Sequence, residues 1–139
     1  IQKPTFNLLI KPMLKNKSDK ELDDWLSTHP LEKSRNLFKG AARGPINEEA
    51  LKDARNQFDF VFGRMEQSLE EGKWLCGAQF TLADIAFAPA IDRLSQCGWL
   101  GIFDKFPKVT EWCERISKRE AYSQMRPTKE QRFTGGVKI

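Results

Sequence analysis

The chain has 139 residues, of which 40% are hydrophobic and 30% charged, and it carries a net charge of +4. A chain of this length can bury a core of its own as one domain, and its mild, mixed charge argues against a nucleic-acid-binding protein. The three cysteines lack the spacing of a disulfide scaffold or a zinc site, which indicates a reducing, cytoplasmic location, and no apolar run is long enough to span a membrane.

The first predicted helix covers residues 5–15. Its apolar side chains recur at helical spacing and define one face, while Pro12 is expected to bend or end the helix. That face consists of Phe6, Leu9, Ile10, Met13 and Leu14. Because the chain begins with Ile rather than Met and its opening residues already have a helical pattern, we expect it to be part of a longer protein.

Two short helices are predicted next. Ser18 and Glu21 have the spacing of a capping box, so a helix is expected to begin there and to end before Pro30. A further short helix is expected at 31–38. The stretch 40–47, which contains glycine, alanine and proline, has the composition of a loop.

A long helix is predicted between Asn47 and Gly72, with Asn47 as its N-cap and Gly72 as its terminator. Glu48 and Glu49 in its first turn suit the helix dipole. Its apolar residues recur every three or four positions, which places them on one face. They are Leu51, Ala54, Phe58, Phe62, Met65 and Leu69.

The most informative stretch is WLCGAQFTLADIAFAPAIDRL at 74–94. Thr81 is predicted to cap a helix at about 82–97, and Asp84 to reach back to the Thr81 N–H and complete a capping box. Since this helix is apolar on nearly every side, we expect it to be the buried centre of the fold, kinked at Pro89. Asp84 is assigned a structural role, because a carboxylate at a helix N-terminus is held ionised and transfers protons poorly.

The last part of the chain is predicted to hold a loop that folds apolar side chains over the core, a helix starting at Pro107, a final turn with Tyr122 and Met125, and a tail after Pro127. No stretch has the alternating pattern or the hairpin turn residues of a β-sheet. The predicted fold is therefore all-α, a bundle of about five to seven helices around the central helix.

The residues alone do not compose an active site. The sequence has no paired carboxylates in an apolar setting, no glycine-rich phosphate loop and no nucleophile beside a base. Cys76 resembles a nucleophile only superficially, because the single histidine, His29, lies in a distant turn, and we interpret Cys76 as a small apolar residue. The sequence by itself thus indicates a helical domain that binds or supports something.

Two segments carry a resemblance to a known family. WLCGAQFTLADIAFAP at 74–89 resembles the core motif of the C-terminal domain of glutathione transferases, in which a glycine-containing loop meets a Ser/Thr-x-x-Asp cap and a buried, kinked helix. FPKVTEWCERISKREAYSQM at 106–125 resembles the helix that follows in that family, with the same order and spacing. The resemblance implies a single helical domain of this type over 1–139, with no thioredoxin-like domain inside the chain.

In that family a thioredoxin-like N-terminal domain holds glutathione and activates its sulfur, while the helical domain forms the wall for a hydrophobic electrophile. The resemblance therefore implies glutathione as co-substrate, a partner thioredoxin-like domain, a homodimer, and an exposed apolar patch where the partner domain docks. It also implies Phe6, Leu9, Ile10 and Met13 as candidate pocket residues, although an apolar helix face is more often plain core. No catalytic residue and no metal ligand is assigned to this chain.

The sequence is also compatible with an alternative function. The same helical domain occurs attached to translation factors and aminoacyl-tRNA synthetases, where it assembles complexes, so a non-catalytic interaction module is the second hypothesis. The sequence that precedes Ile1 in the intact gene separates the two. Strands around a Ser, Cys or Tyr together with a cis-proline loop favour the enzyme, and direct attachment to a synthetase favours the module.

Overall fold

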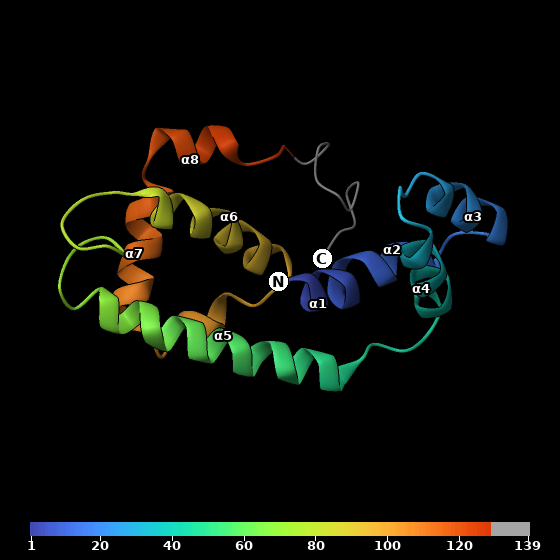
Figure 1. The fold of residues 1–139 in the computed structure, drawn as a ribbon, viewed down its shortest axis with the longest axis horizontal. Helices are drawn as coiled ribbons and strands as arrows, with labels where there is room; N and C mark the ends of the chain where they lie inside the picture. Colours follow the sequence, from blue (N-terminus) through green and yellow to red (C-terminus); the bar gives the residue numbers. More distant parts are fainter. Residues whose placement is uncertain (129–139) are drawn as a thin grey trace.

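The computed structural model describes residues 1–128, and these residues fold entirely into helices and loops, which confirms the predicted all-α class. Figure 1 shows the long helix α5 along one side, α6 on the opposite side of the core, α7 across their ends, and α3 and α4 at the far end of the N-terminal rod. The segments are α1 (Gln2–Pro4), η1 (Thr5–Ile10), α2 (Lys11–Lys15), α3 (Asp19–Ser27), α4 (Glu32–Ala42), α5 (Glu48–Ser68), α6 (Leu82–Gln96), η2 (Leu100–Phe103), α7 (Pro107–Ser117) and α8 (Glu120–Met125).

The N-terminal rod, formed by α1, η1 and α2 without a break, confirms the helix predicted at 5–15 but has a widened middle. Residues Thr5–Ile10 form a π-helix instead of an α-helix. Pro12 has no N–H to bond the Leu8 carbonyl, and its ring crowds that carbonyl, so a wider turn just before Pro12 relieves both problems. The rod does not end at Pro12 but continues through it to Lys15.

Helices α3 and α4 form a side lobe with its own apolar cluster. The predicted cap is present, because the Ser18 hydroxyl oxygen accepts the Glu21 N–H at 3.3 Å and Glu21 Oε2 accepts the Ser18 N–H at 2.7 Å. The loop predicted at 40–47 begins later than expected, since α4 continues to Ala42. Alanine is a strong helix former, and Ala42 is only 1% exposed in the core of the lobe. That core consists of Leu14, Leu22, Leu26 and Ala42.

Helix α5 begins as predicted after Asn47, whose Oδ1 accepts a backbone N–H of the first turn at 2.9 Å. Its predicted apolar face is confirmed, because every member is buried except the half-buried Phe58. The helix ends at Ser68, so the prediction that Gly72 terminates it is wrong. Glycine is required at position 72 for another reason: a Cβ there would lie 2.4 Å from the backbone of Gly77.

Helix α6 starts at the predicted cap and runs through Pro89, but only one side of it is buried. Asp84 and Ala88 face the core, whereas on the opposite side Leu82 is 79% exposed and Ile85 is 51% exposed. The prediction of a helix buried all round is therefore wrong for this side. A helix that is apolar on two sides needs a packing partner on each, and the described residues cover only one of them.

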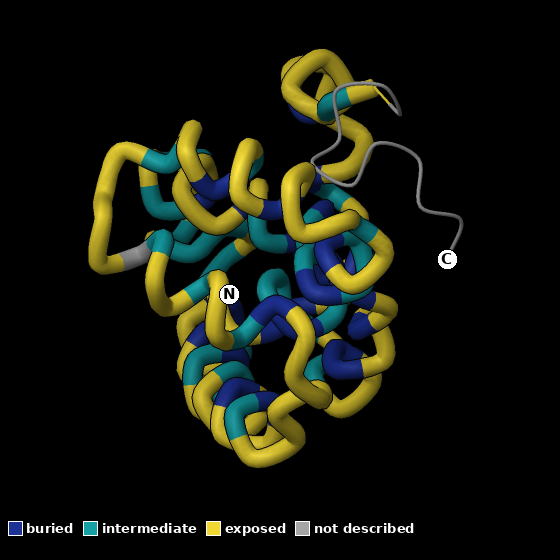
Figure 2. The backbone as a smooth tube through the Cα atoms, turned by 90° about the vertical axis from the view of Figure 1, so that its right-hand side faces the viewer, coloured by how far each residue is buried: buried dark blue, intermediate teal, exposed yellow. Residues whose placement is uncertain are grey.

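The main core lies between α5, α6 and α7, and the loop after α6 closes it with Trp99, Ile102 and Phe103, as predicted. Figure 2 shows buried turns gathered in the interior and exposed turns around the outside. Leu100 of the same loop stays 47% exposed. Within residues 1–128 no helix combines the length and apolar character that crossing a bilayer requires.

Helix α7 is anchored by a side chain from another helix. Glu66 of α5 accepts the Lys108 N–H at 3.0 Å and the Val109 N–H at 2.9 Å, so its carboxylate lies at the positive end of the α7 dipole. Pro107 occupies the first turn, as predicted. No sequence pattern indicated the role of Glu66, because these partners lie 42 and 43 positions away.

Candidate functional site

Asp84 joins three segments at the start of the central helix. Its Oδ2 accepts the Thr81 N–H at 2.9 Å, and the Thr81 hydroxyl oxygen accepts the Ala83 N–H at 3.3 Å within the capping box. Its Oδ1 accepts the Leu75 N–H at 3.0 Å and the indole N–H of Trp112 at 2.8 Å. One carboxylate therefore ties α6 to the turn that precedes it and to α7.

These hydrogen bonds decide the protonation state of Asp84. Burial acts to raise the pKa of this carboxyl, but the N–H groups of Leu75, Thr81 and Trp112 together outweigh burial and hold the pKa below its ordinary value. Asp84 has 0% of its surface exposed, so no substrate reaches it. The arrangement suits an anchor of the fold and not a proton carrier.

The four predicted pocket residues do not share one environment. Leu9 is 4% exposed and belongs to the main core. Phe6 stacks on Phe38 of the side lobe, with ring centroids 5.0 Å apart, and Ile10 and Met13 pack against the cluster of that lobe. Three of the four are thus partly buried where the rod meets the side lobe, and the fourth is core.

Two buried polar side chains, which the sequence analysis missed, pin the same rod to the chain before α5. Asn7 Oδ1 accepts the Asn47 N–H at 2.8 Å, and Lys11 Nζ donates to the Pro45 carbonyl oxygen. Asn7 is 4% exposed and Lys11 is 8% exposed. Their spacing of four residues places both side chains on one face of the rod, and this spacing could have indicated a shared contact. Polar side chains at such positions, however, usually point to solvent.

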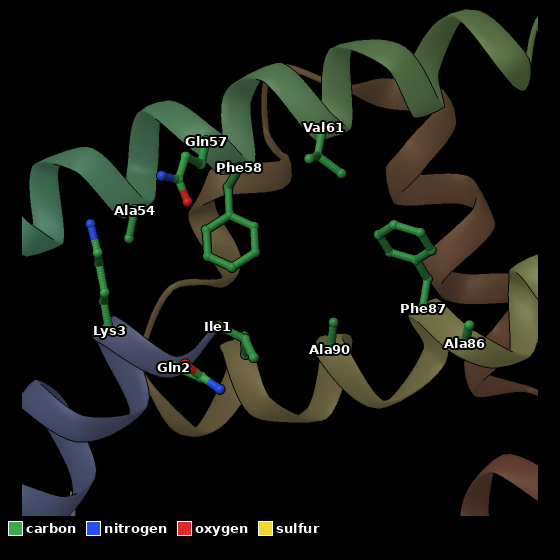
Figure 3. A pocket seen from close by; sticks show the side chains of 10 residues that line it. All are labelled: Ile1, Gln2, Lys3, Ala54, Gln57, Phe58, Val61, Ala86, Phe87 and Ala90. Atoms are coloured by element: carbon green, nitrogen blue, oxygen red, sulfur yellow. The ribbon is translucent and has the colours of Figure 1, made fainter. Parts of the chain in front are cut away.

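An apolar cleft of about 510 Å³ opens between α1, α5 and α6 (Figure 3). Phe58 of α5 and Phe87 of α6 both point into it, and Phe87 is 37% exposed. Lys3 at the rim is paired with Asp53 at 3.4 Å, and the residues that line the cleft include no acid, histidine or cysteine. The cleft has room for an apolar body, but none of its lining groups is suited to activate a nucleophile.

The thiols in the described residues are poorly placed for nucleophilic chemistry. Burial raises the pKa of Cys113 to about 12 and also raises the pKa of Cys97, so both thiols are protonated at neutral pH. Cys76 is exposed in the turn before α6. His29 is engaged in its own turn, where Nδ1 accepts the Leu31 N–H at 3.2 Å. In the part of the chain that the structure describes, no three His, Cys, Asp or Glu side chains gather as metal ligands.

The fold and the Asp84 anchor define a class of protein, namely a helical domain built around a central helix with a Thr-x-x-Asp cap. Residues 1–128 leave one apolar side of that helix exposed. The family model described as "Glutathione S-transferase, C-terminal domain" matches residues 15–120. The chain belongs to this family. The matched range contains Thr81, Asp84 and Trp112, whereas the candidate pocket residues at 6–13 precede it.

Curated relatives agree with this assignment. The chain is 33% identical over 78 residues to a glutathione S-transferase of Hyoscyamus muticus, a match that covers 56% of this chain and 37% of the relative. It is 30% identical over 85 residues to glutathione S-transferase hmp2 of Hypomyces subiculosus, covering 61% and 39%. It is 27% identical over 101 residues to glutathione S-transferase GstB of Escherichia coli K12, covering 70% and 48%. The chain thus spans less than half the length of these relatives, and no solved structure matches it significantly.

Proposed function

We propose that the protein containing this chain is a glutathione transferase, with glutathione as co-substrate and with this helical domain as the wall of the pocket for a hydrophobic electrophile. The observation that carries the proposal is the family match over 15–120, which is supported by relatives that are themselves named glutathione S-transferases. No observation favours the alternative of a non-catalytic interaction module.

The side of α6 that residues 1–128 leave exposed supports a second, docked domain. Leu82, Ile85 and Pro89 follow one another at intervals of three and four residues, so they lie on one side of the helix, and all three are exposed. We call these three residues the α6 stripe. A contiguous apolar surface of this kind commonly marks an interface. We propose that its partner is the thioredoxin-like domain that family membership implies.

A partner domain is also what the chemistry requires. A thiol with an ordinary pKa of about 8.5 must be converted to a thiolate at neutral pH by a hydrogen-bond donor or a positive dipole. Asp84 is sealed in the core and Lys11 is held by the Pro45 carbonyl, so neither is available to a substrate. We therefore assign activation of the glutathione sulfur to the thioredoxin-like domain.

Phe6, Leu9, Ile10 and Met13 remain our candidates for the pocket wall. The partly buried Phe6, Ile10 and Met13 present apolar atoms at the surface of the rod, and the flexible thioether of Met13 adapts to different ligand shapes. Leu9 is enclosed in the core, so its contribution to the wall is to hold the rod in place.

The test uses the intact protein beside residues 1–139 alone. We expect the intact protein to be retained on immobilised glutathione and to conjugate glutathione to an aryl halide, and the helical chain alone to do neither. Turnover by the helical chain alone would contradict the proposed division of labour. An intact protein that neither binds nor uses glutathione would overturn the proposed function.

The pocket wall has its own test. We expect Phe6→Ala and Met13→Ala in the intact protein to raise the KM for the electrophile several-fold and to leave the KM for glutathione unchanged. Phe60→Ala is the matched control, because Phe60 is 67% exposed on α5, outside the proposed wall. An equal rise in both KM values, or no change in either, would contradict the assignment.

We further propose a cytoplasmic homodimer. The location fits the three cysteines of the described residues, which are all free thiols, as expected in a reducing compartment. The proposal of a homodimer is based on family membership. Light scattering coupled to size-exclusion chromatography of the intact protein is expected to give the mass of two copies, and a single-copy mass at micromolar concentration would contradict it.

A further inference from the structure

A cluster of four aromatic rings lies where the N-terminal rod meets the side lobe. Phe38 of α4 is at its centre, and its ring stacks on that of Phe6 with 5.0 Å between the centroids. The ring of Trp25 lies 6.4 Å from that of Phe38, and the imidazole of His29 meets it edge-on at 5.5 Å. All four residues are only partly buried. Aromatic rings that gather from several segments and keep part of their surface in solvent are typical of a binding surface.

Contacts with the backbone hold the side chain of His29 in one tautomer. Its Nδ1 accepts the Leu31 N–H at 3.2 Å, so in the neutral imidazole the proton is on Nε2, which is then a donor. Within residues 1–128 no group accepts a hydrogen bond from Nε2. Arg35 Nε donates to the His29 carbonyl oxygen at 2.7 Å and ties this turn to α4. The side lobe therefore presents a fixed N–H donor beside the aromatic rings.

We infer that the side lobe forms part of the electrophile pocket, and that the His29 Nε2–H binds an acceptor oxygen on an aromatic electrophile. This inference rests on the proposed function, because Phe6 belongs to the proposed pocket wall. Phe38 extends that wall onto the lobe, since its ring contacts both Phe6 and His29. The substrate ring packs against these side chains, and a nitro, carbonyl or ether oxygen at its edge accepts from Nε2.

The cations near the cluster favour a neutral acceptor over a carboxylate. Lys11 Nζ lies 5.8 Å from the Phe6 centroid, but this lysine is 8% exposed and donates to the Pro45 carbonyl oxygen. Arg35 is bonded to the backbone of His29. A carboxylate would have to take these donors from their present partners. The substrate class is therefore a neutral aromatic electrophile that carries an oxygen acceptor.

The experiment compares two electrophiles in the intact protein with glutathione. The nitro oxygens of 1-chloro-2,4-dinitrobenzene can accept from Nε2, whereas benzyl chloride has no such oxygen. The informative variant is His29→Asn, because an asparagine oxygen can still accept the Leu31 N–H two residues on, while the shorter amide does not reach the position of Nε2. We expect kcat/KM for the dinitro substrate to fall by about twofold to tenfold relative to kcat/KM for benzyl chloride. This ratio does not depend on how much of the variant is folded.

A second variant tests the role of Phe38 in positioning the wall. Phe38→Leu is expected to raise the KM for both electrophiles several-fold and to leave the KM for glutathione unchanged, because the ring that supports Phe6 and His29 is lost. Leu37→Ala is the matched control, since Leu37 is 68% exposed on the same helix. An equal rise in the KM for glutathione would show a general loosening of the fold and would contradict the positioning role.

The outcomes separate this inference from the proposed function. If the intact protein conjugates glutathione to both electrophiles and the ratio is the same in wild type and His29→Asn, the inference is overturned and the proposed function stands. Retention on immobilised glutathione without turnover of either electrophile would also overturn the inference. An intact protein that neither binds nor uses glutathione would overturn both.

Discussion

The indole N–H of Trp112 donates to Asp84 Oδ1 over 2.8 Å, although the two residues lie 28 positions apart in the sequence. Trp112 is 1% exposed and Asp84 is 0% exposed, so the contact is sealed from water. The same carboxylate accepts from Thr81 and Leu75. The carboxylate that caps α6 therefore also connects the start of this helix to the preceding turn and to α7.

We expect Asp84→Ala to lower the free energy of unfolding by about 3 kcal/mol or more, because three buried donors lose their acceptor. A lone helix cap contributes only about 0.5–2 kcal/mol. Urea denaturation measures the difference, and Asp84→Asn, which keeps one acceptor oxygen, is expected to lie in between. A loss within the range of a lone cap would show that the bonds from Leu75 and Trp112 add little.

The lowered pKa of Asp84 gives stability a definite pH dependence. An unfolded aspartate has a pKa of about 3.9, so in acid the unfolded state binds the proton more readily than the folded state. The contribution of Asp84 is complete well above that value and is lost as the pH falls through the lower folded-state pKa. Urea unfolding between pH 2 and 7 should show a steeper acid loss in the wild type than in Asp84→Asn, and parallel curves would contradict the assignment.

Glu66→Ala should loosen the first turn of α7. It removes the acceptor of two backbone N–H groups, which is expected to destabilise the protein by about 1–2 kcal/mol. Amide hydrogen exchange at Lys108 and Val109 should accelerate more than at other core amides. Glu70→Ala, at an exposed position after the same helix, is the control and should leave both amides protected. Unchanged exchange in Glu66→Ala would show that water replaces the carboxylate without loss.

Two glycine substitutions are expected to act in opposite directions. Gly72→Ala places a Cβ 2.4 Å from the Gly77 backbone, so the turn before α6 must shift, at a cost of about 1–3 kcal/mol. Gly40 lies inside α4 with nothing within 4 Å of an added Cβ, so Gly40→Ala should stabilise the protein by about 0.5–1 kcal/mol. Thermal melting distinguishes them, and equal melting temperatures would refute the close-approach argument.

Leu82→Lys tests the α6 stripe. Leu82 is 79% exposed in this chain, so the substitution should change the stability of residues 1–139 by less than about 0.5 kcal/mol. If the stripe is the interface with the thioredoxin-like domain, the same substitution should lower the melting temperature of the intact protein. Phe60→Lys, at another exposed apolar position, is the control. An intact Leu82→Lys protein with the melting temperature of the intact wild type would exclude this interface.

The features that the sequence predicted correctly are local. Ser18 with Glu21 and Thr81 with Asp84 are capping pairs separated by three residues, and Asn47 caps through the first turn that follows it. Such capping patterns can be recognised in a sequence because both partners lie within one helical turn. The apolar face of α5 could also be predicted from the sequence, because its apolar residues repeat with the period of a helix.

The errors arose where a distant contact overrode a local signal. Gly72 looked like a helix terminator, but glycine is required there by the approach of Gly77. The loop expected at 40–47 was shortened because Ala42 packs into the side lobe. By contrast, the assignment of Phe6, Leu9, Ile10 and Met13 to a pocket stays a prediction, and the side lobe and the main core divide these residues between them.

The sequence by itself determined that this chain is a helical domain with a capped central helix, because caps and periodicity are encoded within a few residues. Only the tertiary structure decided that Asp84 also holds Trp112 and Leu75, that Glu66 anchors α7, and that one side of α6 has no cover within residues 1–128. Those facts depend on which distant segments meet, and helical periodicity carries no information about the partner of each face.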